Sequence, residues 1–215
     1  MKIYAISGLG ADRRAFHKLK LDMPIIHIEW IEPLKNESIT KFAKRLSAKI
    51  DTKEDFIIMG VSFGGMIATE ISAQLQPKLT ILISSAETKH ELRPFFRFIG
   101  KTGLLKILPA SFFNPPKRIA KYLFGTSNTE LLYQILDDTN LSFAKWAVNQ
   151  LVKWDRTEKL EGEALKISGE KDKLIPSKGF SNSILIKDGE HFMIVDKAEE
   201  INEVINRKIN SLQLV

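Results

Sequence analysis

Short apolar runs alternate with longer segments of mixed polarity along most of the chain. Six runs of five to seven residues are bounded by polar or turn-forming positions, which is typical of buried strands. The runs cover 2–7, 25–31, 55–61, 79–84, 164–168 and 183–187. Single strands that alternate with helical segments favour an α/β fold, with a mostly parallel sheet of about six strands flanked by helices.

Three longer segments carry apolar residues at helical spacing. The first is predicted over 37–50, and a helix between two neighbouring strands makes those strands parallel. The second follows residue 62 and ends before Pro77, because proline cannot continue a helix. The third is predicted over 198–212, with an apolar stripe formed by Ile201, Val204, Ile205 and Ile209.

Residues 88–155 interrupt this alternation with helix starts and no strand pattern. Three starts are indicated at 114–116, 127–130 and 140–142, because short polar side chains there can accept hydrogen bonds from the exposed amides of a first helical turn. Gly125 is a predicted helix end. We therefore expect one α/β core made of 1–87 and 156–215, with 88–155 inserted as a helical cap.

The composition narrows the class of protein without indicating an activity. At 215 residues the chain can bury one sizeable core and is too short for two ordinary catalytic domains. It contains no cysteine, which excludes disulfides, thiolate nucleophiles and cysteine-ligated metal sites. No apolar stretch reaches the roughly 18 residues of a membrane-spanning helix, and the N-terminus lacks a signal peptide's apolar region. These features predict a cytoplasmic protein without stable membrane insertion.

The positive charge is concentrated in the first half of the inserted segment. The formal net charge is +6, and residues 88–121 contain eight Lys or Arg against one acidic residue, Glu91. Such a surface can steer an anionic substrate, an acidic carrier protein or an anionic lipid surface, although a plain solvated helix face is the more common explanation. No recognition motif accompanies the charge, so nucleic acid is not an expected partner.

The string Gly60-Val61-Ser62-Phe63-Gly64 matches G-x-S-x-G where a strand ends and a helix begins. A serine on such a sharp turn needs small residues two positions before and two after it, which Gly60 and Gly64 supply. The turn exposes the Ser62 hydroxyl above the sheet, and the Phe63 amide at the helix N-terminus can face a developing oxyanion. A glycine-rich turn without reactivity is the alternative.

A serine hydroxyl needs a general base, which is usually histidine. His191 follows the last predicted strand, in the loop 187–192, at the carboxyl end where the Ser62 turn also lies. His17 and His27 are expected in packing or surface roles, whereas His90, at the start of the inserted segment, is a candidate for substrate contact. His191 is therefore the predicted base.

The base in turn needs a carboxylate that fixes its tautomer. Glu170 and Asp172 both follow the fifth run, and Asp172, in a loop closed by Pro176, is the preferred candidate. Glu87, after the fourth run, is a weaker alternative, and a solvated turn charge is the non-catalytic explanation for all three. The chain order of serine, acid and histidine after three separate strands is that of the hydrolases with G-x-S-x-G.

A second oxyanion donor is expected after the first strand. In Ser7-Gly8-Leu9-Gly10, glycines on both sides of Leu9 let a backbone amide approach substrate closely, so the Leu9 amide is the candidate. A phosphate-binding loop is the competing explanation, but the segment lacks G-x-G-x-x-G and the chain lacks a Walker A lysine.

The segments SGLGADRRAF, GVSFGG, KISGEKDKLIP and KDGEHF resemble the α/β-hydrolase superfamily, over nearly the whole chain apart from the inserted segment. The layout is similar to that of small capped carboxylesterases, including those that act on esters borne by acyl carrier protein. The resemblance implies an acyl-enzyme hydrolase in which Ser62, Asp172 and His191 are nucleophile, acid and base. Ser7-Gly8 stands where many relatives have His-Gly, and the family's usual first two strands are missing.

The predicted activity is hydrolysis of a carboxylic ester with an apolar acyl or aryl group, without cofactor or metal. The inserted segment holds eleven of the nineteen aromatic residues, which could line an apolar pocket over Ser62 or only attach its helices to the core. The expected partner is a small ester substrate, in an anionic or carrier-bound form where the basic charge steers it. Hydrolysis of a thioester or a carbon-carbon bond by the same triad, and ligand binding without turnover, remain alternatives.

Overall fold

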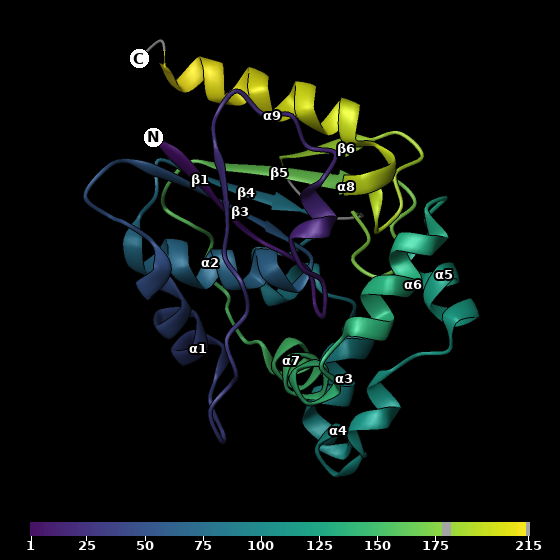
Figure 1. Ribbon diagram of the computed structural model, residues 1–215. Helices are drawn as coiled ribbons and strands as arrows, with labels where there is room; N and C mark the ends of the chain where they lie inside the picture. Colours follow the sequence, from purple (N-terminus) through teal and green to yellow (C-terminus); the bar gives the residue numbers. More distant parts are fainter. Residues whose placement is uncertain (178–181, 214–215) are drawn as a thin grey trace.

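A fully parallel sheet of six strands forms the centre of the computed structural model, which describes residues 1–177 and 182–213 (Figure 1). The spatial order is β2-β1-β3-β4-β5-β6. The strands are β1 (Lys2–Ile6), β2 (Ile25–His27), β3 (Phe56–Val61), β4 (Leu79–Ile83), β5 (Ala164–Gly169) and β6 (Ser183–Ile186). Each strand overlaps one of the six apolar runs, so the predicted α/β sheet is confirmed.

The second strand is shorter than the apolar run that predicts it. It pairs with β1 only over Ile25–His27, whereas the run extends to residue 31. Beyond this point the Trp30 ring packs against Phe143, with 5.0 Å between ring centroids, and the Trp30 Nε1–H donates to the Ala11 carbonyl at 3.2 Å. Because these contacts draw the chain away from the sheet, the apolar residues after His27 serve packing rather than strand pairing.

Helices cover both faces of the sheet and bury two apolar clusters. On one face lie α1 (Ile39–Leu46) and α2 (Phe63–Leu75), and on the other lie α8 (Met193–Asp196) and α9 (Ala198–Gln213) (Figure 1). Successive strand residues point to opposite faces, so Ile57 and Met59 join the cluster under α9 while Ile58 joins the cluster under α2. The three helices predicted from apolar spacing are thus confirmed.

Five helices lie between β4 and β5 in the sequence. They are α3 (Pro94–Thr102), α4 (Leu104–Ile107), α5 (Lys117–Phe124), α6 (Thr129–Asp138) and α7 (Leu141–Lys153). The predicted caps Asn128 and Asn140 accept hydrogen bonds from first-turn amides of α6 and α7, and Gly125 ends α5 with a φ of 56°. At α5 the N-cap is Pro116 and no side chain caps the helix, so that predicted start lacks its polar cap.

Single turns of 3-10 helix complete the described structure: η1 (Arg13–Phe16), η2 (Ser47–Lys49), η3 (Lys89–Glu91) and η4 (Ala110–Phe113).

Within the described residues, no helix has the length and apolar character that crossing a bilayer requires. The cytoplasmic location stays a prediction. So does the division of the chain into a core of 1–87 and 156–215 and a cap of 88–155.

The inserted helices are attached to the core through α7. Phe143 and Trp146 of α7 pack against Trp30, Phe42 and Phe63, with ring centroids 4.4 to 6.2 Å apart. Four other aromatic side chains of the insertion, Phe95, Phe98, Phe112 and Tyr122, are exposed. The aromatic residues named here therefore divide between attachment to the core and the outer surface.

Candidate active site

Ser62 occupies a strained turn between β3 and α2. Its backbone has φ 53° and ψ −122°, a conformation that costs a non-glycine residue about 1–3 kcal/mol. Gly60 and Gly64, the two glycines of the motif, allow the sharp turn from β3 into α2. A Cβ on Gly60 would lie 2.4 Å from the Gly64 carbonyl oxygen, and a Cβ on Gly64 would lie 2.1 Å from the Ser7 carbonyl oxygen. Gly60 therefore lets the start of α2 pack on β3, and Gly64 lets it pack on the end of β1.

Ser85 supports this turn, although the sequence pattern gave no reason to select it. Its hydroxyl donates to the Ser62 carbonyl oxygen at 2.7 Å, and its side chain lies where a Cβ on Gly65 would be. Ser85 follows β4 directly, at the same edge of the sheet as Ser62. The only sequence signal is a pair of serines, residues 84 and 85, after the fourth apolar run.

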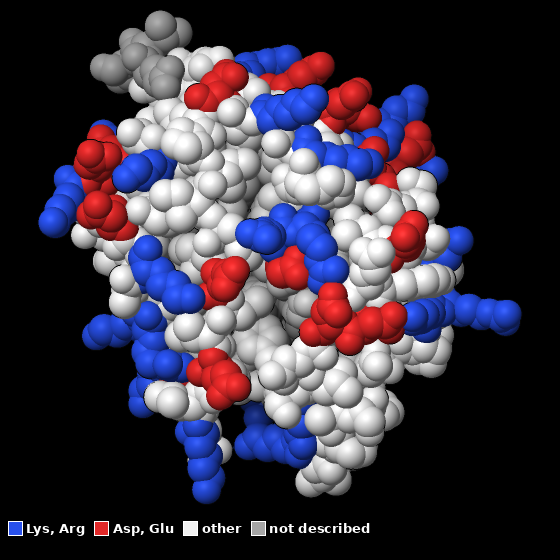
Figure 2. All heavy atoms as spheres, in the orientation of Figure 1, with Lys and Arg blue, Asp and Glu red and all other residues white. Residues whose placement is uncertain are grey.

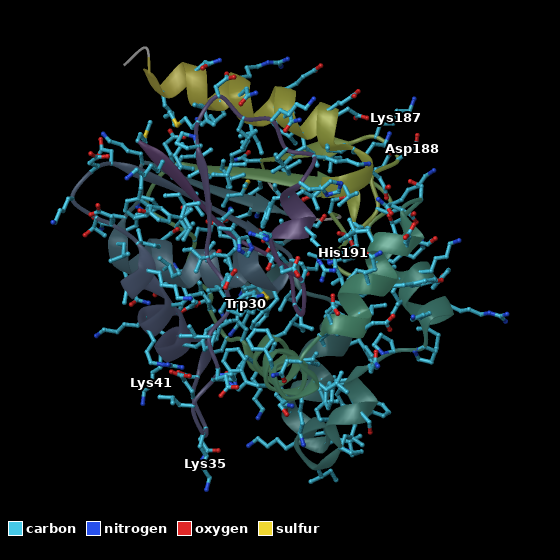
Figure 3. All side chains as sticks on the ribbon, viewed as in Figure 1. Trp30, Lys35, Lys41, Lys187, Asp188 and His191 are labelled. Atoms are coloured by element: carbon cyan, nitrogen blue, oxygen red, sulfur yellow. The ribbon has the colours of Figure 1, made fainter. Side chains whose placement is uncertain are left out.

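The structure brings Ser62, His191 and Asp172 into one series of hydrogen bonds. The Ser62 Oγ lies 2.8 Å from the His191 Nε2, and the His191 Nδ1 lies 2.8 Å from the Asp172 Oδ2. A carboxylate can only accept, so the proton of the imidazole belongs on Nδ1 and leaves Nε2 to accept from the serine hydroxyl. His191 lies between the sheet and the helices α5 and α6 (Figure 3). The side chains of Asp172 and His191 are both buried.

The loops after β5 and β6 hold the acid and the base against each other. A Cβ on Gly169 would lie 2.4 Å from the Gly189 carbonyl oxygen, and the Lys171 amide donates to the same oxygen at 2.8 Å. The second oxygen of Asp172 accepts from the Leu174 and Ile175 amides at 2.8 and 2.9 Å. These bonds fix the Asp172 carboxylate so that its free oxygen faces the imidazole.

The other carboxylates considered from the sequence have different partners. Glu170 accepts from the Asp188 amide at 3.1 Å. Glu87 is buried and accepts from the Leu160 amide at 2.7 Å. Neither takes the position beside His191, so the geometry favours Asp172 among the three.

The remaining histidines lie apart from this series. The His17 Nδ1 lies 2.7 Å from the Arg14 carbonyl oxygen at the surface, and His90 is exposed in η3. Both ring nitrogens of His27 are buried with no partner in the described residues, and burial lowers the pKa of this imidazole. His191 instead packs edge-on against the Phe124 ring of the insertion, with centroids 5.6 Å apart, a contact that sequence reasoning did not single out.

Two backbone amides are available beside Ser62. A Cβ on Gly8 would lie 3.6 Å from the Ser62 Cβ, which places the loop containing Leu9 against the serine. In the described parts of the chain, neither the Leu9 amide nor the Phe63 amide donates to a protein acceptor. Gly10 has a φ of 71° and its carbonyl accepts from the Thr139 hydroxyl at 3.2 Å, so the insertion holds this loop. Both predicted oxyanion donors thus belong to segments that meet at Ser62.

A large cleft lies beside the Leu9 loop rather than directly over Ser62. It has a volume of about 890 Å³ and runs between the chain after β2 and the start of α7, with Trp30, Phe143 and Trp146 in its wall. Gly10 and Ala11, which follow Leu9 in the chain, belong to its wall. Among the described residues, no group of three or more His, Asp or Glu side chains is placed to hold a metal ion.

Neither a protein-family model nor a curated protein sequence matches the chain. Solved structures are similar over almost its full length. An esterase from Thermogutta terrifontis shows 13% identity and a TM-score of 0.76, covering 99% of this chain and 90% of its own. MenH from S. aureus shows 17% identity and a TM-score of 0.73, covering 99% of this chain and 94% of its own. ClbQ from the colibactin NRPS/PKS pathway shows 16% identity and a TM-score of 0.71, covering 99% of this chain and 98% of its own.

These likenesses and the sheet order define the class of fold. The protein has the α/β-hydrolase fold, which its structural neighbours share. The six-stranded parallel sheet agrees with the fold class predicted from the sequence.

Proposed function

We propose that the protein is a serine hydrolase that cleaves a carboxylic ester through an acyl-enzyme intermediate. The observation that carries this proposal is the unbroken series from the Ser62 Oγ through the His191 imidazole to the Asp172 carboxylate, with 2.8 Å at each step. A weak nucleophile, a base in contact with it and an acid that orients the base are the groups that acyl transfer requires.

Acylation begins when the His191 Nε2 accepts the hydroxyl proton and the Ser62 Oγ attacks the ester carbonyl carbon. The carbonyl oxygen becomes an oxyanion, which the Leu9 and Phe63 amides stabilise by hydrogen bonds. When the carbon-oxygen bond to the alcohol breaks, the imidazolium returns its proton to the leaving alkoxide. Water then attacks the acyl-enzyme by the same route, with His191 again as base, and releases the acid and free Ser62.

Asp172 acts through His191 rather than on the substrate. Its carboxylate holds the proton on Nδ1 and stabilises the imidazolium that forms during each transfer. The two amides that bind the other Asp172 oxygen keep the carboxylate from rotating away. The orientation of the imidazole is therefore built into the loop after β5.

An apolar acyl or aryl ester is the proposed substrate class. The Phe124 ring packs against His191, and Leu9 is only partly buried beside the serine turn, so apolar groups flank the reacting hydroxyl. The structural neighbours include esterases, which supports the same class of bond. The favourable transfer of apolar groups from water would then contribute to binding.

The test is intact-protein mass spectrometry after treatment with an alkyl fluorophosphonate, with Ser62→Ala as the matched variant. We expect a single adduct on the wild-type protein, no adduct on the variant, and turnover of short and medium p-nitrophenyl esters by the wild type alone. A folded wild-type protein without label and without ester turnover would contradict the proposal and favour ligand binding without catalysis. Labelling without ester turnover would keep the nucleophile and move the substrate to a thioester or a carbon-carbon bond.

A further inference from the structure

The outer surface of the insertion exposes large apolar side chains. The elements α3, α4 and η4 pack around α7, and each of them carries large apolar side chains that no described part of the chain covers. Phe98 is 67% exposed and Ile107 is 79% exposed, far above the exposure of a packed side chain. We name this the outer insertion surface; its apolar residues are Phe95, Phe98, Leu104, Ile107 and Phe112.

The same surface is basic and has no acidic residue of its own. From residue 92 to residue 129 the sequence contains seven Lys or Arg and no Asp or Glu. In Figure 2 the tip of the lobe at the lower right, where Figure 1 places α4, is white and shows neither acidic nor basic side chains in this view. Along the sequence, the apolar residues of these helices are interleaved with the basic ones.

Three lysines of this surface have no carboxylate partner in the described structure. Lys101 and Lys106 are exposed and form no ion pair with the described acidic residues. Lys153, at the end of α7, lies against Lys106, and its partial burial together with that neighbouring charge lowers the pKa of Lys153. Neighbouring ammonium groups with no carboxylate partner among the described residues attract anions from outside the protein.

We propose that the outer insertion surface docks the protein on the anionic surface of a lipid bilayer. Exposed Phe, Leu and Ile side chains partition into the boundary between headgroups and acyl chains, while lysines beside them bind lipid phosphates. Exposed apolar side chains and lysines are both present on the short helices of the insertion. The cleft beside the Leu9 loop has none of these residues in its wall, so the outer insertion surface is separate from that cleft.

This docking is peripheral and differs from insertion of a spanning helix. The contact uses separate side chains on α3, α4 and η4, and none of the described helices could span the bilayer. It does not rest on the proposed esterase activity, because Ser62 and His191 take no part in it. Lipid binding and ester turnover can therefore fail separately.

The experiment is co-sedimentation of the full-length protein with vesicles of phosphatidylcholine alone or mixed with phosphatidylglycerol. We expect binding to the mixed vesicles at low salt, weaker binding at high salt because ions screen the lysines, and little binding to phosphatidylcholine alone. Ser62→Ala should bind as the wild type does. Such a result would show that lipid binding at the outer insertion surface does not require the Ser62 hydroxyl.

Two paired substitutions test the two components. Lys101→Glu with Lys106→Glu should weaken partitioning into anionic vesicles by more than about tenfold, since each lysine near an anionic surface contributes roughly fivefold. Phe98→Ser with Ile107→Ser should weaken it by about tenfold through loss of apolar burial. The matched controls are Lys41→Glu on α1, which Figure 3 shows on another part of the molecule, and Leu185→Ser on the edge strand β6. Both controls should bind as the wild type does.

Three results would overturn the proposal. The first is absence of binding to anionic vesicles by folded protein, and the second is equal binding to vesicles with and without phosphatidylglycerol. The third is self-association that rises with protein concentration and is abolished by Phe98→Ser with Ile107→Ser, which would make this surface an interface between copies of the chain. Analytical ultracentrifugation without lipid detects that outcome, and circular dichroism shows that each variant is folded.

Discussion

The Asp172 carboxylate and the His191 imidazole meet at 2.8 Å although they belong to loops after different strands. The approach depends on glycine, because a Cβ on Gly169 would collide with the backbone of Gly189. Parallel strands bring their carboxyl ends to one edge of the sheet, and these glycines allow the two loops there to pack in contact. The geometry of the site is thus a consequence of backbone packing more than of long side-chain reach.

Replacing Asp172 with asparagine tests the role of this pair. The amide would no longer hold a proton on Nδ1 or stabilise an imidazolium, so kcat for ester hydrolysis should fall by about three to four orders of magnitude. The measurement is kcat and KM with a p-nitrophenyl ester. The KM should change far less than kcat, because Asp172 does not touch the substrate.

Glu170→Gln is the control for that prediction. Glu170 lies two residues from Asp172 in the same loop, but its carboxylate accepts only from the Asp188 amide in the described structure. An uncharged amide oxygen can still accept that bond, so kcat should stay within about threefold of the wild type. A loss in Glu170→Gln as large as that in Asp172→Asn would mean that the two carboxylates have been assigned to the wrong roles.

Gly64→Ala should destabilise the fold as well as the site. The new Cβ would lie 2.1 Å from the Ser7 carbonyl oxygen, so α2 must shift away from β1, at a cost of about 3 kcal/mol in the free energy of unfolding. Gly103→Ala is the comparison, because its Cβ would meet no atom within 4 Å and only its φ of 68° is unfavourable. Urea denaturation should give about 1 kcal/mol for Gly103→Ala. Equal losses in both variants would contradict the steric explanation.

The apolar runs and the order of the candidate residues along the chain were enough to predict the sheet and to select Ser62, Asp172 and His191, which lie together in the structure. Each strand was visible as an apolar run, and each candidate followed a different strand. The sequence could not predict which residues an individual side chain contacts. Trp30 lies in an apolar run yet leaves the sheet to stack on Phe143, because a residue far along the chain supplies a better contact than the edge of β1 does.

Buried charge is a second feature that the sequence pattern does not reveal. Lys166 lies within the apolar run that predicted β5. In the structure it is buried, and its ammonium group pairs with Glu87, at 3.5 Å, and with Glu91. Both acidic residues come from the chain after β4, so only the pairing of β4 with β5 reveals the contact. Glu87 was considered for the catalytic acid but is held in this ion pair.

This buried group gives a stability prediction. Lys166→Met keeps most of the side-chain volume but leaves two buried carboxylates without their cation, which should lower the free energy of unfolding by about 3–5 kcal/mol. Lys208→Met is the control, because Lys208 pairs with the exposed Glu163 at 2.7 Å and such surface pairs contribute about 0–1 kcal/mol. Chemical denaturation measures both values. A loss below 1 kcal/mol for Lys166→Met would show that the buried pairs are not needed for stability.

His27 should make the protein less stable in mild acid. Both ring nitrogens are buried without a partner in the described structure, and burial lowers the pKa of the imidazole below its ordinary value of 6.5. The unfolded chain therefore binds a proton more readily than the folded one. The free energy of unfolding should be unaffected by His27 above 6.5 and should decrease as the pH falls from 6.5 toward the folded pKa.

The matched variant is His27→Phe, which keeps a ring beside Phe16, 5.7 Å away between centroids, and removes the titrating nitrogens. Stability curves of the wild type and this variant, measured by chemical denaturation on either side of pH 6.5, should diverge only on the acid side. The wild type should lose stability there relative to the variant. Curves that stay parallel across the whole range would show that His27 has the same pKa in both states, which would require that water reaches its ring in the folded protein.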